Sequence, residues 1–235
     1  MPPVAILAGG LATRMLPLTE KVPKALLPIN GEPFVAHQLR LLESSGVERV
    51  VLCAGYLGEL IQDFIGDGSR FHLSVGFSFD GLTLLGTAGA IKKALPQLGR
   101  EFFVLYGDSY LPCDYRTVLS AFRASGKAAL MTVFRNEGQW DGSNVEYSDG
   151  KIWAYDKRTP SNRMKHIDYG LGVFRESAFD ELAGGRPHDL TDLYQELLTR
   201  GDLAAFEISQ RFYEIGSPAG LRELSDYLTG LEATL

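Results

Sequence analysis

The strongest constraint on the fold is an alternation, in the first half of the chain, between short apolar segments typical of strands and segments with helical periodicity. The strand-like segments are residues 4–7, 49–53, 73–77 and 101–106, and the helix-like segments are 33–46, 57–65 and 88–95. Parallel strands need helical crossovers, and continuously apolar strands need cover on both faces. The alternation therefore predicts an α/β fold with a doubly wound, mainly parallel mixed sheet and helices on both faces.

The pattern changes after residue 127. Strand-like segments at 128–134, 144–147, 151–155 and 166–174 follow one another, with polar turns such as SDG (148–150) between them. Helical periodicity returns at 190–201 and at 218–233. Closely spaced strands of this kind predict partly antiparallel pairing in a small strand-rich lobe beside the main sheet. Since no repeat, low-complexity segment or linker interrupts the chain, we expect a single domain over residues 1–235.

Composition excludes several classes of protein. The 235 residues are 45% hydrophobic, which is enough for a full core, and the net charge of -6 has the wrong sign for a nucleic-acid partner. The two cysteines are too few for a disulfide scaffold and lack metal-ligand spacing, which fits a reducing compartment. No apolar run approaches the length of a membrane span. We expect a cytoplasmic protein without a membrane partner, and the sequence leaves homo-oligomerisation open.

The first strand-like segment ends in a glycine turn, at Ala8, Gly9 and Gly10. Ligands of doubly wound sheets bind outside the carboxyl ends of the strands, and adjacent glycines let backbone N–H groups approach an anion. Arg14 and Lys24 follow in a loop that three prolines stiffen. The glycine spacing matches neither the dinucleotide fingerprint nor the phosphate loop. On the residues alone, an anion site and a structural turn with solvated charges both stay open.

The same segment resembles a family signature. LAGGLATRMLPLTEKVPKALLPING (7–31) is similar to the sugar nucleotidyltransferases, or nucleoside-diphosphate-sugar pyrophosphorylases, whose pattern runs L-x-G-G-x-G-T-R, then P-L-T, then P-K. The similarity continues through LLGTAGAIKKAL (84–95), FFVLYGDSY (102–110), AYDK (154–157), IDYGLGVF (167–174) and FYEIGSP (212–218). Each piece alone is weakly specific, but six pieces in order cover nearly the whole chain.

The resemblance implies transfer of a nucleotidyl group from a nucleoside triphosphate to a hexose or heptose 1-phosphate, with release of pyrophosphate. It implies that residues 1–126 mainly bind the nucleotide and that 127–235 mainly bind the sugar. The catalytic residues would be Arg14, which clamps the triphosphate, Lys24, which neutralises the α-phosphoryl group, and Asp108, which holds Mg2+. Nucleotide-binding backbone groups would come from Leu7, Ala8, Gly9 and Gly10 and from Gly86, Thr87 and Gly89.

Several matches depart from the family pattern. Glu214 stands where the second metal-binding aspartate is usual, and a longer carboxylate can still reach the cation. On the sugar side, Lys157 would grip the sugar phosphate beside Asp156. Asp168 and Gly170 match a strand that lines the sugar pocket, where asparagine or a small residue is more usual, and Asn144 falls where a Tyr-Gly pair is frequent. The sugar itself therefore stays unnamed.

Other interpretations remain at this stage. Asp108 in a Gly-Asp turn, or Gly86 and Thr87 at a helix start, also have ordinary structural explanations. A non-catalytic relative that binds nucleotide sugars for regulation is one alternative. A cytidylyltransferase for a phosphorylated alcohol such as phosphocholine is another, because such relatives share the YEI-type segment. A glycosyltransferase would need an Asp-x-Asp motif after the central strand, and GDSYL offers one acid there.

Overall fold

The computed structural model describes residues 1–10, 15 and 19–232. Its α-helices are α1 (Phe34–Ser44), α2 (Gly58–Ile65), α3 (Gly86–Leu98), α4 (Tyr115–Ser125), α5 (Leu190–Thr199) and α6 (Pro218–Glu232). Its strands are β1 (Val4–Ala8), β2 (Pro28–Ile29), β3 (Glu32–Pro33), β4 (Arg49–Ala54), β5 (Ser74–Phe79), β6 (Glu101–Tyr106), β7 (Ser109–Tyr110), β8 (Ala129–Arg135), β9 (Val145–Ser148), β10 (Lys151–Tyr155), β11 (His166–Arg175), β12 (Leu203–Ile208) and β13 (Tyr213–Glu214).

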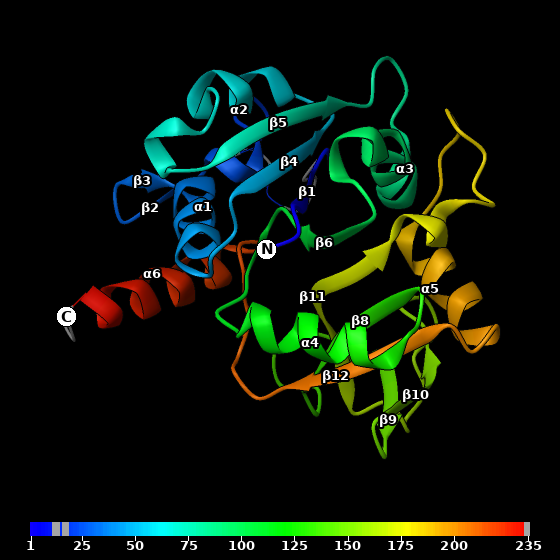
Figure 1. Ribbon diagram of the computed structural model, residues 1–235. Helices are drawn as coiled ribbons and strands as arrows, with labels where there is room; N and C mark the ends of the chain where they lie inside the picture. The colour runs from blue at the N-terminus through cyan, green and yellow to red at the C-terminus, as the bar shows by residue number, and fades with distance from the viewer. Residues whose placement is uncertain (11–14, 16–18, 233–235) are drawn as a thin grey trace.

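A nine-stranded sheet forms the centre of the molecule (Figure 1). Its main path runs β10-β9-β11-β6-β1-β4-β5, and β8 pairs with β11 and β12. β1 lies parallel to both β4 and β6, and β4 lies parallel to β5. β11 is antiparallel to β6 and β8 and so joins the two halves. The predicted mixed, mainly parallel sheet with antiparallel additions is confirmed, and the later strands extend the same sheet.

Helices cover both faces of this sheet, because alternate residues of each buried strand point to opposite sides. Val4 and Ile6 of β1 pack in a cluster with α1, α2 and α4, whereas Ala5 packs in a second cluster with α3 and α5. A third, smaller cluster lies between α6 and the segment around β2 and β7. Figure 1 shows α6 extending beside α1, away from the far edge formed by β9 and β10.

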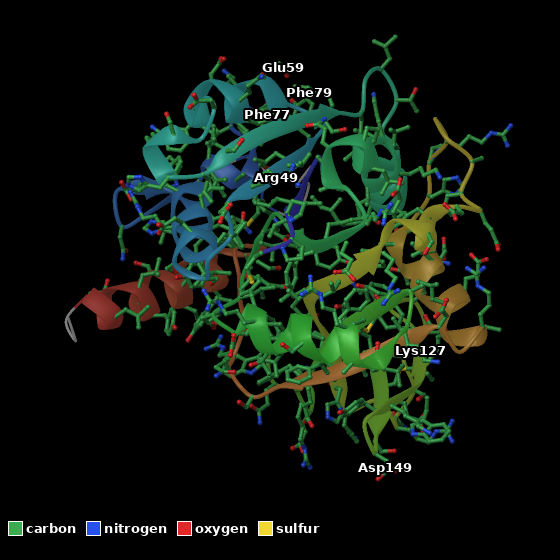
Figure 2. All side chains as sticks on the ribbon, in the orientation of Figure 1. Arg49, Glu59, Phe77, Phe79, Lys127 and Asp149 are labelled. Carbon is green, nitrogen blue, oxygen red and sulfur yellow. The ribbon has the colours of Figure 1, made fainter. Side chains whose placement is uncertain are left out.

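The local structure follows short-range sequence signals. Asp149 and Gly150 both have positive φ and close the β9–β10 hairpin, as the polar SDG turn predicted (Figure 2). Asp114 caps α4 by accepting hydrogen bonds from the N–H groups of Arg116 and Thr117. Within the described ranges, no helix is both long and apolar enough to cross a bilayer.

Candidate active site

A cavity of about 400 Å³ opens at the carboxyl ends of β1 and β6. This is the edge at which ligands of doubly wound sheets bind. The cavity collects backbone and side chains from β1, β4 and β6, from the segments that follow β1, β5 and β6, and from α3. Its lining residues are Leu7, Ala8, Gly9, Gly10, Pro23, Lys24, Ala25, Cys53, Asp80, Leu84, Gly86, Thr87, Ala90, Tyr106, Gly107 and Asp108.

Lys24 and Asp108 meet at one end of this cavity. Lys24 begins a short 3-10 helix (Lys24–Leu26) behind the extended Pro23, and Asp108 follows β6 directly. The Lys24 Nζ lies 2.8 Å from the Asp108 Oδ2, and both side chains keep contact with solvent, at 15% and 33% exposure. A cation and a carboxylate separated by 84 positions in the sequence therefore share one wall, open to an incoming ligand.

Glu214 lies beside Asp108, because the C-terminal segment pairs with the strand that follows it. β13 is antiparallel to β7, with Glu214 opposite Ser109, and the Ile215 N–H donates to the Asp108 carbonyl at 2.9 Å. Glu214 reaches solvent, but protein surrounds it on most sides. That desolvation, followed by repulsion from Asp108 and Asp141, raises the pKa of Glu214 to about 7. A carboxylate from the middle of the chain and one from near its C-terminus therefore converge.

The other predicted nucleotide-binding residues divide into two groups. Gly86 and Thr87 line the cavity together with residues 7–10, but Gly89 does not line it. The Gly89 N–H donates to the His188 carbonyl, and Thr87 Oγ1 accepts the Leu190 N–H, so both connect α3 to the segment that leads into α5. Arg14 lies outside the described residues.

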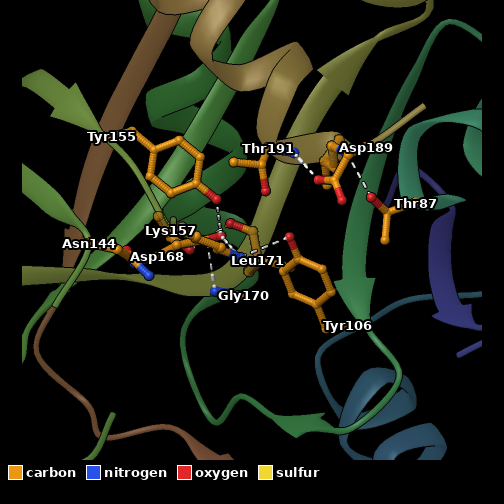
Figure 3. Close-up of polar contacts among 12 residues, drawn as sticks. Thr87, Tyr106, Asn144, Tyr155, Lys157, Asp168, Gly170, Leu171, Asp189 and Thr191 are labelled. Atoms are coloured by element: carbon orange, nitrogen blue, oxygen red, sulfur yellow. Dashed lines mark hydrogen bonds and ion pairs between the residues drawn. The ribbon is translucent and has the colours of Figure 1, made fainter. Parts of the chain in front are cut away.

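A second polar cluster lies on the other side of Tyr106 (Figure 3). The Lys157 Nζ is 3.0 Å from the Asp168 Oδ2 and donates to the Tyr106 hydroxyl at 3.3 Å. The Tyr155 hydroxyl donates to the same Asp168 oxygen at 3.2 Å. Since Tyr106 also lines the cavity, Lys157 stands at the border between the cavity and this cluster.

The remaining predicted sugar-side residues hold the backbone around this cluster. Asn144 Oδ1 accepts the Asp168 N–H at 2.9 Å, and the Gly170 N–H donates to Asp168 Oδ1 at 3.1 Å. The Asp156 carboxylate accepts the N–H groups of Arg158 and Thr159 and so closes a turn. The Asp156 carboxylate is therefore engaged in hydrogen bonds within its own turn.

Sequence reasoning missed several residues of the site, among them Cys53, Asp80, Tyr106 and Tyr155. Asp80 directly follows β5, and its Oδ2 accepts the Leu85 N–H at 3.0 Å across the loop into α3. The strand-end rule that selected Asp108 applies equally to Asp80 and could have found it. The two tyrosines gave no such signal, because their aromatic side chains fit equally well in a core.

Comparisons with known proteins agree on the family. The model of the nucleotidyl transferase family matches residues 4–144. The chain is 29% identical to UTP–glucose-1-phosphate uridylyltransferase of Synechocystis, over 83% of this chain and 55% of that protein, so it spans about half of that relative's length. It is 28% identical to N-acetylmuramate alpha-1-phosphate uridylyltransferase of Neisseria meningitidis, over 93% and 94% of the two chains.

Solved structures share the fold. HddC from Yersinia pseudotuberculosis, complexed with GMP-PN, superposes with a TM-score of 0.80 at 23% identity, over 97% of this chain and all of that one. A Bacillus anthracis protein described as a putative glucose-1-phosphate thymidylyltransferase, in complex with a sucrose, gives a TM-score of 0.82 at 21% identity, over 96% and 94% of the two chains. With a family model that matches well over half of its residues, the chain belongs to the nucleotidyl transferase family.

Proposed function

We propose that the chain transfers a nucleotidyl group from a nucleoside triphosphate to a sugar 1-phosphate, a hexose or heptose derivative, and releases pyrophosphate. The observation that carries the proposal is the pair Lys24 and Asp108 at one end of the cavity, with Glu214 beside Asp108 and Lys157 at the border of the cavity. The names of the two relatives above, both sugar-phosphate uridylyltransferases, support the same reaction class.

The chemistry asks for positioning and charge neutralisation. An oxygen of the sugar phosphate attacks the α-phosphorus, the bond to the departing pyrophosphate breaks, and no covalent enzyme intermediate is needed. Lys24 neutralises charge on the α-phosphoryl group, and its partner Asp108 already holds it at the cavity wall. Arg14 is assigned to the triphosphate and the departing pyrophosphate on its match to the signature alone.

Asp108 and Glu214 fit a divalent cation that takes its other ligands from phosphate oxygens and water, as Mg2+ usually does. Desolvation and then repulsion from Asp108 raise the pKa of Glu214, and a cation between the two carboxylates would relieve that repulsion. Among the described residues, no group of three or more His, Cys, Asp or Glu could hold a metal without the substrate. When bound, Mg2+ would neutralise charge that develops on the phosphates.

We assign the nucleotide to one side of Tyr106 and the sugar phosphate to the other. Backbone groups of residues 7–10 and of Gly86 and Thr87 hold the nucleotide, and Gly89 supports that loop through its bond to His188. Lys157 receives the sugar phosphate. The other assigned sugar-side residues shape this wall: Asn144, Asp156, Asp168 and Gly170.

The test is pyrophosphate release from a panel of nucleoside triphosphates and sugar 1-phosphates with Mg2+, including CTP with phosphocholine. We expect activity with a sugar 1-phosphate, and we expect Asp108→Asn to lower it by about a hundredfold or more because a metal ligand and the Lys24 partner are lost together. Asp63→Asn, an exposed change on α2, is the matched control. Full activity in Asp108→Asn, or turnover of phosphocholine alone, would contradict the proposal.

A further inference from the structure

We propose that Asp168 is a positioning residue that keeps the Lys157 amine charged and oriented toward the cavity, rather than a group that contacts the sugar. The inference rests on the proposed function, because it takes Lys157 as the cation that receives the sugar phosphate. It changes the role that the sequence suggested for Asp168, from lining the sugar pocket to supporting a neighbour. Figure 3 shows the contacts involved.

The backbone of β11 is built to place this carboxylate. Asp168 pairs with Val133 and Gly172 pairs with Met131, so the register of β11 shifts against β8 between them. Gly170, inside the shift, has a φ of +96°, which side chains with a Cβ rarely adopt. Its N–H consequently points back and donates to Asp168 Oδ1 at 3.1 Å. The irregular strand therefore fixes one oxygen of Asp168.

The second oxygen of Asp168 holds Lys157. Its Oδ2 accepts the Tyr155 hydroxyl at 3.2 Å and lies 3.0 Å from the Lys157 Nζ. The Asp168 side chain is 2% exposed, whereas the Lys157 side chain is 35% exposed. A ligand in the cavity can therefore reach Lys157, but Asp168 lies behind it with both oxygens engaged.

Asp168 is also the counter-charge of Lys157. Burial alone would lower the pKa of the Lys157 amine, but the charge of the Asp168 carboxylate and its hydrogen bond outweigh burial and raise it. Burial, with Asp168 as the next cause, raises the pKa of both tyrosines, so they stay neutral. The other titratable groups that interact electrostatically with these residues are Tyr194 of α5, Asp189 before it, and Glu214 of β13.

The Asp168 carboxylate therefore prevents deprotonation of Lys157, whose amine lies near two aromatic rings. Lys157 Nζ lies 4.7 Å from the centre of the Tyr106 ring and 5.8 Å from that of Tyr155. Without Asp168, burial would lower the pKa of this amine toward the assay range, since neutral rings compensate a desolvated ammonium only partly. The affinity for a doubly charged sugar phosphate would then fall as the pH rises.

The experiment measures kcat/KM for the sugar 1-phosphate against pH in the native chain and in Asp168→Asn, which keeps the size of the side chain and an acceptor for the Gly170 N–H. We expect a new loss of activity on the alkaline side of the variant's profile. We also expect the KM for the sugar phosphate to rise about tenfold or more, as for a lost charge-assisted contact, with the KM for the nucleotide nearly unchanged.

Two controls separate positioning from simple loss of structure. In the double variant Asp168→Asn/Lys157→Arg the new alkaline loss should disappear, because a guanidinium does not deprotonate. In lysine-labelled protein, the 13Cε signal of Lys157, assigned by its absence from Lys157→Arg, should titrate at lower pH in Asp168→Asn than in the native chain.

The outcomes are distinguishable. If the alkaline limb is unchanged in Asp168→Asn, or persists with arginine at position 157, the positioning role is wrong even though the enzyme is active. If the native chain releases no pyrophosphate with any substrate, the proposed function fails. The lysine titration then still decides whether Asp168 holds Lys157 charged.

Discussion

At the scale of single residues, Glu214 couples the site to pH. Its pKa in the folded chain is about 7, above its ordinary value of 4.5, because of burial and the charges of Asp108 and Asp141. Between these two values the folded chain binds more protons than the unfolded chain. The stability that this group contributes is therefore complete below about pH 4.5 and is lost as the pH rises through about 7.

Because stability falls as the pH rises, we predict that Glu214→Gln and the native chain have the same melting temperature at low pH when metal is removed with EDTA. Above about pH 7 the variant should melt slightly higher, since it carries no repelled charge; the effect is small because Glu214 is exposed to solvent, which screens the repulsion. Mg2+ should raise the melting temperature of the native chain more than that of the variant. A native chain and variant that respond alike to pH would show that Glu214 is not crowded by Asp108.

Lys24 supports a second prediction. Lys24→Met should lower kcat by about a hundredfold, because a cation aimed at developing phosphoryl charge has its greatest effect in the transition state. Stability should change little, since the ion pair with Asp108 is open to solvent. Lys21→Met, an exposed lysine three positions earlier, is the control and should keep near-native activity. Equal losses in the two variants would remove the specific role of Lys24.

How well the sequence predicted these residues depends on whether a local sequence pattern marks them. Asp108 was predicted because it adjoins a strand end and matches a signature, and Lys24 because it lies in the proline-rich loop after the first strand and matches the same signature. The cavity contains both. Asp168 was predicted to line the sugar pocket. Its burial and its ion pair with Lys157 depend on a register shift in β11, which no local sequence pattern indicates. Tertiary geometry, rather than residue type, decides between contact with a ligand and support of a neighbour.

At the scale of elements, α3 depends on glycines for its close approach to the segment before α5. A Cβ built on Gly89 would lie 2.8 Å from the Arg186 carbonyl oxygen, which is closer than real Cβ atoms come. The Gly89 N–H donates to the His188 carbonyl and so holds this segment against α3. The approach therefore fixes the nucleotide loop at Gly86 and Thr87.

We predict that Gly89→Ala destabilises the chain by about 1–3 kcal/mol, as expected for overpacking against backbone. The matched change is Gly230→Ala in α6, where a Cβ would meet nothing within 4 Å. There the better helix propensity of alanine should stabilise by roughly 0.5–1 kcal/mol. Urea denaturation of both variants tests this. A change in the free energy of unfolding with the same sign in both variants would show that the backbone near Gly89 can move aside for a Cβ.

Most elements were predictable from periodicity, and the missed ones show the limits. The strands over 49–54 and 101–106 have uniformly apolar sequences and matched their predictions. α4 was missed although Asp114 and Gly126 flank it as cap residues and its buried residues Tyr115, Val118, Leu119 and Phe122 have helical spacing, so the signal was present in the sequence. β12 was missed because LAAFEI contains two alanines, which are depleted in strands, and because its pairing partner, β8, lies about 70 residues earlier.

At the scale of the whole molecule, the last segment of the chain completes a site begun by the first strand. β13 pairs with β7, and α6 then packs Leu224 and Leu228 against Ile29 and Phe34 in the small third cluster. That cluster is separate from the two that cover the main sheet. A small satellite cluster should open at lower free energy than the main core, and its opening would release Glu214 from Asp108.

We therefore predict that Leu224→Ala, which empties a fully buried position, weakens the site more than an equally large change elsewhere. The Ile215 N–H, bonded to the Asp108 carbonyl, should exchange with solvent faster in this variant, and more Mg2+ should be needed for half-maximal activity. Leu197→Ala in α5 creates a comparable cavity in the second cluster and should leave that amide protected. If both variants speed exchange at Ile215 equally, the molecule opens as one unit and the C-terminal segment is not a separate clamp on the site.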